Sequence, residues 1–273
     1  MKKHILAAGI SVLALGLVLA GCGSQKKADS KTTTVRVGIV GSDKRVWQPI
    51  ANRLKKQNIN IKIVSFADYN KPNQALLDGD IDLNAFQHQY FLDNWNKTHK
   101  SNLKAIGKTV LAPLKVYSNK ISNLKKLKKG DTVTVPNDPT NEGRALQLLE
   151  TAGLITLDDA ALPTTHDIKS NKLHLTVTAI DASQTARSLK SAQAAVVNSG
   201  VATDAGLKIK DSIYTEKITA KSKPWINIIV AKGSEKNNKV YKKIVKAFQT
   251  EATAKTIKKV YKGNEVPAWN YKF

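Results

Sequence analysis

The residue best suited to bind a charged small molecule is Arg144, near the start of a predicted helix. Its planar guanidinium matches a carboxylate or a phosphate, and the free N–H groups and dipole of a helix start favour an anion in the same place. In open α/β sheets, the turn between a strand and a helix lies at the edge where ligands bind. A capped surface helix with a solvated arginine fits the same pattern, so this segment alone supports both interpretations.

A strand–turn–helix unit would position that arginine. Residues 132–135 alternate polar and β-branched side chains and predict the end of a strand. Asp138 is a good N-cap, and Pro139 suits the first helical position, where no N–H is needed. Apolar residues then recur at helical spacing, at Ala145, Leu148, Leu149 and Ala152. We therefore expect a helix over residues 139–151, with Gly153 just beyond its end.

Two aromatic side chains and an imidazole form a second candidate group. Tyr69 follows a predicted strand at residues 61–66, and Phe86 and His88 follow another at residues 81–85. Because both turns come after strand carboxyl ends, the three side chains are expected in one crevice. Their rings suit an aliphatic or thioether group, since sulfur packs well on aromatic rings. The alternative is that both aromatics belong to the core and that the histidine only begins a helix.

The order of predicted elements indicates an α/β fold with two lobes and a ligand cleft between them. The expected strands are residues 35–40, 61–66, 81–85, 103–110, 114–117, 132–135, 173–180, 194–198 and 226–231. The expected helices lie at residues 46–54, 89–96, 139–151 and 183–192. A long helix through Val240 and Ala252, and a shorter one to about Tyr261, would end the chain.

Two series of strands and helices define the expected domains. One lobe would contain residues 35–117 and 222–273, and the other residues 118–221. The chain would cross between the lobes near residues 114–117 and 225–231.

The N-terminus predicts export and lipid anchoring. Lys2 and Lys3 precede an uncharged apolar run, residues 5–20, which has the length of a signal-peptide core. Small residues then precede Cys22, as in the bacterial lipobox, so residues 1–21 would be a lipoprotein signal peptide and Cys22 would carry the lipid. A buried core cysteine is the alternative. Residues 22–34 are rich in Ser, Lys and Thr and predict a flexible tether. The expected location is the outer face of a bacterial cell membrane.

The chain of 273 residues is strongly basic, with 44 Lys and Arg against 21 Asp and Glu. Such a balance often indicates nucleic-acid binding, but an exported protein does not meet chromosomal DNA. Anionic lipid headgroups or an anionic cell wall are the expected partners of this charge, unless it is only a solvated surface. A surface adhesion protein therefore remains an alternative function.

Neither an enzyme nor a metal site is predicted. The nucleophile-elbow, P-loop, zinc-protease and dinucleotide-binding motifs are all absent from the sequence. Cys22 is the only cysteine, which excludes an intramolecular disulfide. The histidines are scattered rather than clustered as zinc ligands, at His88, His99, His166 and His174. An exported enzyme on the same scaffold is the least supported alternative, because no nucleophile–base pair is visible.

Three motifs occur together in the chain: PNDPTNEGR at residues 136–144, GDIDLNAFQH at residues 79–88, and the lipobox Cys22. Together they resemble the methionine-binding lipoprotein family, the substrate-binding subunits of ABC importers for methionine. The similarity runs from about Val35 to Trp269. It implies a two-lobe, periplasmic-binding-protein-like fold that holds one amino acid in its cleft. Such a receptor needs no cofactor and docks on a permease whose ATPase subunit uses the ATP.

The resemblance also implies roles for individual residues. Arg144 matches the arginine that clamps the ligand carboxylate, and Asn141 would support it. Asn198 and Asn227 match asparagines that bind the polar groups of the ligand backbone. The wall around the ligand side chain would be Tyr69, Phe86 and His88.

Several positions near the expected cleft depart from the family pattern. Relatives usually have Leu-Pro-Arg where this chain has Thr185-Ala186-Arg187, a Tyr near Val201, acidic residues at Lys190 and Ser191, and a Tyr at Trp225. These changes leave the expected arginine clamp intact and concern the ligand side chain. Another amino acid, or a short peptide ending in methionine, is therefore the alternative ligand.

Overall fold

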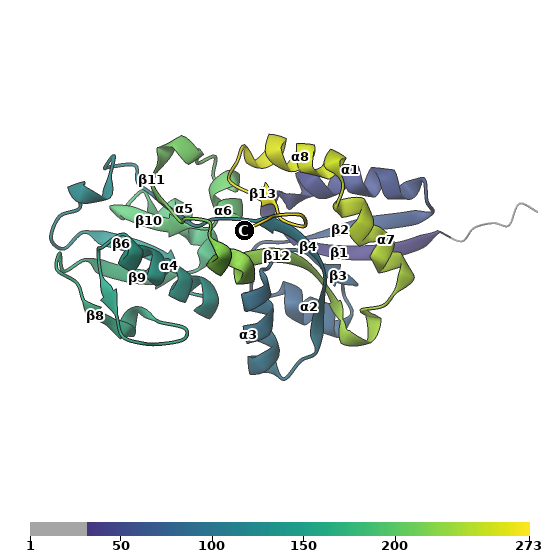
Figure 1. Cartoon of the computed structure of the whole chain (residues 1–273), viewed down its shortest axis with the longest axis horizontal. Helices are drawn as coiled ribbons and strands as arrows, with labels where there is room; N and C mark the ends of the chain where they lie inside the picture. Colours follow the sequence, from purple (N-terminus) through teal and green to yellow (C-terminus); the bar gives the residue numbers. More distant parts are fainter. Residues whose placement is uncertain (1–31) are drawn as a thin grey trace, which may run out of the picture. The chain divides into compact units, whose positions relative to one another are not determined.

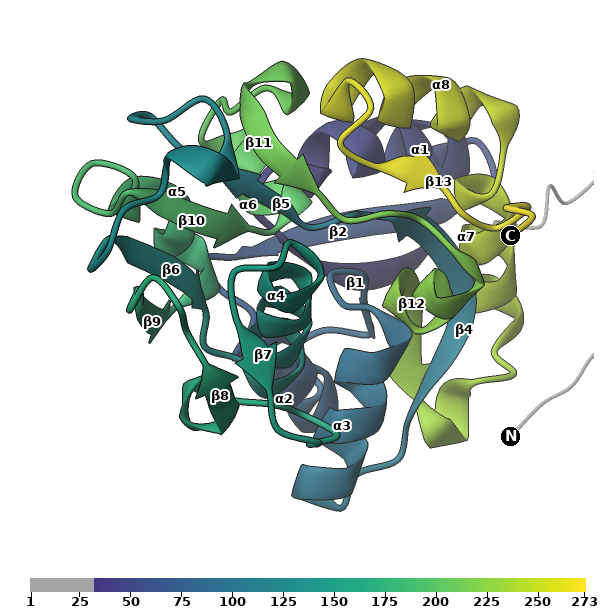
Figure 2. The same cartoon turned by 60° about the vertical axis from the view of Figure 1, so that its left-hand side comes forward.

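A computed structural model describes residues 32–273, which build two large β-sheets with helices on both faces of each (Figures 1 and 2). The expected signal peptide, Cys22 with its expected lipid and most of the expected tether lie outside the described residues. No helix within residues 32–273 combines the length and apolar character needed to cross a bilayer.

The first sheet has six strands in the order β13-β4-β12-β3-β1-β2. Strands β1, β2 and β3 are parallel, as the alternation of strands and helices predicts, and β12 runs antiparallel to β3 and β4. The strands are β1 Thr33–Val40, β2 Ile59–Phe66, β3 Leu83–Asn84, β4 Leu103–Leu111, β12 Ile226–Lys232 and β13 Val266–Pro267.

Helices cover the two faces of this sheet with separate hydrophobic cores. Ile229 and Ala231 of β12 point into one core, and their neighbours Ile228 and Val230 point into the other, as the two-residue period of a strand requires. The first core is shared with α1 Lys44–Lys55, α7 Lys239–Phe248 and α8 Glu251–Tyr261. The second is shared with α2 Pro72–Asp78 and α3 Gln89–His99.

The second sheet has five strands in the order β11-β5-β10-β6-β9. They are β5 Lys115–Tyr117, β6 Thr132–Pro136, β9 Thr176–Ile180, β10 Ala194–Val197 and β11 Ser212–Thr215. Helix α4 Pro139–Thr151 packs on one face, and α5 Thr185–Ser188 and α6 Ser199–Asp204 lie on the other. A small antiparallel pair, β7 Thr156–Leu157 and β8 Ile168–Ser170, follows α4.

The chain passes between the sheets twice. Residues 112–114 connect β4 to β5, and residues 216–225 connect β11 to β12. Both connections lie just before the strands expected to be the crossings. Strand β5, at the end of the range expected for the first lobe, pairs with β10 and β11 in the second sheet.

Two predicted helices are shorter than expected. The helix predicted for residues 183–192 is reduced to a 3-10 turn and α5, since the Ser188 hydroxyl donates to the Thr185 carbonyl and competes with helical hydrogen bonds. The long C-terminal helix was also predicted wrongly. It ends at Phe248, and Thr250 starts α8 by accepting a hydrogen bond from the Thr253 N–H.

The strand predicted over residues 173–180 also starts later than expected. His174 has a positive φ of 48° and belongs to a turn, so β9 begins only at Thr176.

Because α7 packs closely on β4, we predict that Gly107 of β4 cannot be replaced by a larger residue without loss of stability. A Cβ at Gly107 would lie 2.6 Å from Cγ1 of Val245, so Gly107→Ala should lower the free energy of unfolding by about 1–3 kcal/mol. Urea denaturation measures this loss. The matched control is Gly200→Ala in α6, where the nearest atom to the new Cβ is Oε1 of Glu265 at 3.9 Å. The control should be neutral or up to about 1 kcal/mol more stable, and equal losses in the two variants would contradict the prediction.

Candidate functional site

A cavity of about 500 Å³ is lined by residues from both sheets and their helices. All seven residues expected to contact a ligand line it, namely Tyr69, Phe86, His88, Asn141, Arg144, Asn198 and Asn227. The structure therefore brings together residues that are separated by up to 158 positions in the sequence, counting from Tyr69 to Asn227.

The apolar side of the cavity is an aromatic wall. The ring centroids of Tyr69 and Phe86 lie 6.0 Å apart, and Phe91 meets Phe86 edge to face at 5.6 Å. The sequence-based prediction missed Phe91, which also lines the cavity. Its signal was present, because it lies three residues after His88 and therefore on the same side of α3.

His88 is held neutral in a single tautomer. Its Nδ1 accepts the Phe91 N–H at 3.0 Å and so caps α3, which leaves the proton on Nε2. Nε2 lies 3.5 Å from Oδ1 of Asn141. Burial, together with the positive charge of Arg144, lowers the pKa of His88 to about 3. A neutral imidazole lets this side of the cavity remain apolar.

A chain of amide hydrogen bonds orients the asparagines. Nδ2 of Asn141 donates to both carboxylate oxygens of Asp138, at 2.9 and 3.0 Å, so its Oδ1 faces Asn198. Nδ2 of Asn198 then donates to that oxygen at 2.9 Å. This leaves Oδ1 of Asn198 buried without a hydrogen-bond partner in the described part of the chain.

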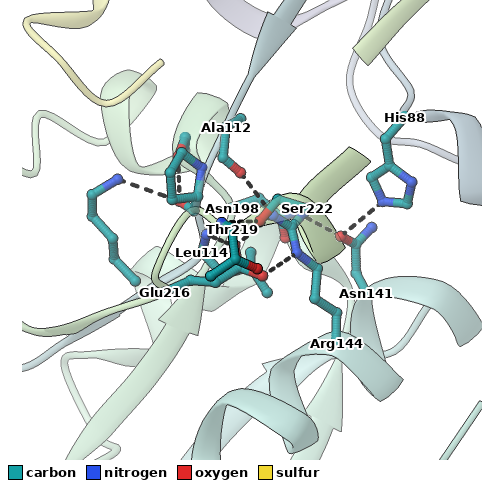
Figure 3. Close-up of polar contacts among 12 residues, drawn as sticks. His88, Ala112, Leu114, Asn141, Arg144, Asn198, Glu216, Thr219 and Ser222 are labelled. Atoms are coloured by element: carbon teal, nitrogen blue, oxygen red, sulfur yellow. Dashed lines mark hydrogen bonds and ion pairs between the residues drawn. The ribbon is translucent and has the colours of Figure 1, made fainter. Parts of the chain in front are cut away.

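Arg144 is buried and paired with Glu216, as Figure 3 shows. The Nε and Nη2 atoms of Arg144 donate to the two carboxylate oxygens of Glu216 at 2.9 and 2.6 Å, and Nη2 also donates to the Ala112 carbonyl at 3.1 Å. The ring of Trp225 lies 4.5 Å from the guanidinium carbon. Within residues 32–273, Nη1 is the guanidinium nitrogen with no hydrogen bond, and Arg144 lines the cavity.

The anion expected at the start of α4 is supplied by the protein itself. Asp138 is the N-cap, and its carboxylate accepts the Asn141 N–H at 3.1 Å. The predicted unit is otherwise confirmed, because α4 covers Pro139–Thr151 and Gly153 has a φ of +76°. A ligand anion would therefore bind to the Arg144 side chain, because Asp138 already occupies the start of the helix.

The partner of Arg144 could not be predicted from the sequence. Glu216 lies 72 positions further along the chain and has no motif around it. Its carboxylate also accepts the Leu114 N–H at 2.9 Å, and its own N–H donates to the Leu114 carbonyl at 2.9 Å. Arg144 and Glu216 thus contact both connections between the sheets.

Another part of the cavity lining is acidic. It contains Asp43, Asp204 and Glu265, and Asp43 accepts a hydrogen bond from the Tyr261 hydroxyl. Burial raises the pKa of Asp43 to about 7 and raises the pKa of Glu265. This part of the lining is therefore less negative at neutral pH than three ionised carboxylates would be. No group of residues in the described part of the chain is placed to hold a metal ion.

The buried neutral histidine predicts a pH-dependent stability. Its pKa is about 3 in the folded state and about 6.5 in the unfolded chain, so the unfolded state binds more protons between these values. The stabilisation is complete above about pH 6.5 and is lost as the pH falls toward 3. Between pH 7 and pH 5, wild type should lose about 2 kcal/mol more than His88→Asn, in which Asn can still cap α3.

Urea denaturation of both proteins at the two pH values checks this difference. Asp43, whose raised pKa acts with the opposite sign, is present in both proteins and cancels in the comparison. An equal loss in wild type and His88→Asn would show that His88 does not account for the pH dependence.

Comparison with known proteins places this chain in a family. The family model described as NlpA lipoprotein matches residues 35–269. The D-methionine-binding lipoprotein MetQ of Salmonella typhi is 40% identical over 270 residues, which cover 96% of this chain and 97% of that protein.

Solved structures show the same fold. The substrate-binding protein of a methionine transporter from Streptococcus pneumoniae has a TM-score of 0.83 and 42% identity, covering 86% of this chain and 96% of its own. A nutrient-binding protein from Burkholderia cenocepacia bound to methionine has a TM-score of 0.82 and 39% identity, covering 86% and 99%. The expected two-lobe α/β binding-protein fold is thereby confirmed, and the chain belongs to the NlpA lipoprotein family.

Proposed function

We propose that this protein is a lipid-anchored receptor that binds methionine, as the L or D isomer or both, and delivers it to an ABC importer. The similar proteins from Salmonella typhi, Streptococcus pneumoniae and Burkholderia cenocepacia support methionine as the ligand. The protein acts by binding, and a partner ATPase subunit supplies the energy for transport through the permease. Lipid on Cys22 would hold the receptor on the outer face of the cell membrane.

The observation that carries this proposal is the set of polar groups left unpaired around the cavity. Nη1 of Arg144 has two N–H donors for a carboxylate, and Oδ1 of Asn198 is an acceptor for an ammonium group. The Asn227 side chain lines the cavity and forms no hydrogen bond within residues 32–273. The Asn198 oxygen is buried, so leaving it unpaired is unfavourable, and a zwitterion that pairs with it and with the other two groups is stabilised.

The aromatic wall accounts for the ligand side chain. Tyr69, Phe86 and Phe91 surround apolar space with ring faces and edges, and the neighbouring His88 is neutral. A thioether is apolar and polarisable, and its sulfur packs favourably against aromatic rings. A charged side chain would lose its hydration there without gaining a partner.

Ligand binding would favour closure of the two lobes. We assign residues 35–111 and 226–273 to one lobe and residues 115–215 to the other, with the two connections as hinges. The ligand would contact His88 and Asn227 of the first lobe and Arg144 and Asn198 of the second. A ligand with contacts on both sides shifts the equilibrium toward the closed form, which would dock on the permease.

Loss of the arginine should strongly weaken methionine binding. Arg144→Ala leaves the buried ligand carboxylate unpaired, which costs roughly 2–5 kcal/mol and raises the Kd about 30- to 5,000-fold. Isothermal titration calorimetry measures the change. Because the substitution also leaves Glu216 unpaired, the double variant Arg144→Ala/Glu216→Gln tests binding without a buried lone carboxylate.

Arg187→Ala is the matched control for this prediction. Arg187 also lines the cavity but is exposed, so its removal should change the Kd by less than about threefold. A Kd for Arg144→Ala within that same range of the wild-type value would contradict the assignment of Arg144 as the carboxylate clamp.

The ligand itself identifies the function. Protein purified without added ligand would be denatured, and the released small molecules would be identified by mass spectrometry. We expect methionine, in a yield that falls in Arg144→Ala and is unchanged in Arg187→Ala. Release of a different amino acid or of a peptide would show that the protein is a receptor but that its ligand is not methionine. A protein that releases nothing and binds no added amino acid would contradict the receptor function.

A further inference from the structure

The positive charge of the first lobe is concentrated on one layer of helices. Helices α1, α7 and α8 contain eleven Lys and Arg residues and a single acidic residue, Glu251. The three helices cover the same face of the six-stranded sheet, and α1 packs against both α7 and α8 (Figures 1 and 2). We call the outer surface of these three helices the basic helix face.

The lysines of α7 and α8 on this surface point to solvent and have no acidic partner within the described residues, whereas Arg45 of α1 pairs with Asp204 at 3.8 Å. All four exposed positions of α7 are lysines, and three more lysines are exposed on α8. None of these lysines forms an ion pair within residues 32–273. The seven are Lys239, Lys242, Lys243, Lys246, Lys255, Lys258 and Lys259.

The opposite face of the same sheet does not share this charge. Helices α2 and α3 together contain one lysine, Lys97, and two acidic residues, Asp78 and Asp93. The high net charge of the chain is therefore not spread evenly over the first lobe. A surface with this asymmetry interacts with an extended anionic surface in one orientation, since only one side is attracted.

The chain enters the first lobe at the edge of the basic helix face. The N–H of Thr33, the first residue of β1, donates to the carbonyl of Asn58, just after α1 and the exposed Lys55 and Lys56. Cys22 lies ten positions before Thr32, and this stretch spans at most about 35 Å when fully extended. An anchor at Cys22 would therefore keep this edge close to the bilayer.

We propose that the basic helix face lies against anionic phospholipid headgroups and sets the orientation of the anchored receptor on the membrane. Lysines near an anionic bilayer are attracted over about one Debye length, so several on one plane act together. The short distance to the anchor favours the bilayer over more distant anionic polymers. The proposal rests on anchoring through Cys22 and does not depend on the identity of the ligand in the cavity.

The test measures how close this face lies to lipid. The mature lipidated protein is reconstituted into phosphatidylcholine vesicles with or without phosphatidylglycerol, and energy transfer is measured to an acceptor dye on the lipid headgroups. The donor dye is attached at Ala252→Cys, an exposed position of α8 that carries no charge. A second protein carries the dye at Gln74→Cys, exposed on α2 at the opposite face of the sheet.

We expect transfer from the Ala252→Cys label to rise when phosphatidylglycerol is present and to fall again in high salt, while transfer from the Gln74→Cys label does not rise. Replacing four lysines of the face by Gln should reduce the population in this orientation at least about tenfold. These are Lys242, Lys243, Lys246 and Lys259. The control with equal charge loss replaces four exposed lysines of the second lobe, Lys125, Lys126, Lys128 and Lys129, and should leave transfer unchanged.

Equal energy transfer from the Ala252→Cys label in vesicles with and without phosphatidylglycerol would overturn the proposal. An equal loss of transfer in the second-lobe control variant would also overturn it, because the net charge of the protein and not the basic helix face would then cause the attraction. If the lysines were needed for binding to soluble polyphosphate but their replacement did not change energy transfer on vesicles, the partner of this face would be an anionic polymer and the proposal would be wrong. Failure to associate with neutral vesicles would overturn the anchor and this proposal together. Methionine binding, measured separately by calorimetry, distinguishes that failure from a failure of the receptor function.

Discussion

The buried charge of Arg144 constrains most of the site. Its side chain is 4% exposed, and a guanidinium so far from water is stable only with a partner. Glu216 supplies that partner through two parallel hydrogen bonds, and the Ala112 carbonyl takes another donor. This arrangement fixes the plane of the guanidinium, so that its remaining nitrogen is directed by the protein before any ligand arrives. Preorganisation of this kind reduces the entropy lost on binding.

The same ion pair links the cavity to the parts of the chain that would move. Ala112 and Leu114 belong to one connection between the sheets, and Glu216 begins the other. A charge bound at Arg144 would therefore alter the electrostatic field at both connections as well as in the cavity. Trp225, at the end of the second connection, lies over the guanidinium and meets His88 edge to face at 4.9 Å. Trp225, where the resemblance leads us to expect a tyrosine, thus contributes to the packing around Arg144.

One buried acceptor of the site has no hydrogen-bond partner within the described residues. Asp138, Asn141 and Asn198 form a chain in which each acceptor orients the next amide, and the last oxygen has no partner in the described residues. Most buried oxygens in proteins accept a hydrogen bond from the protein itself or from water. A binding site needs this oxygen unpaired, because specificity for a polar ligand arises when the protein groups are satisfied only by that ligand.

The sequence by itself determined the local units of this protein. The cap at Asp138, the span of α4, the parallel order of the first strands and the seven residues around the cavity all follow from spacing, turn chemistry and family motifs, which are local properties of the chain. Only the tertiary structure decided that Glu216 pairs with Arg144, that β5 belongs to the second sheet, and that α7 stops at Phe248. The physical reason is that these outcomes depend on which groups are buried next to one another. A buried polar group must find a partner among its neighbours in space, and those neighbours can be far apart in the sequence, where no local pattern marks them.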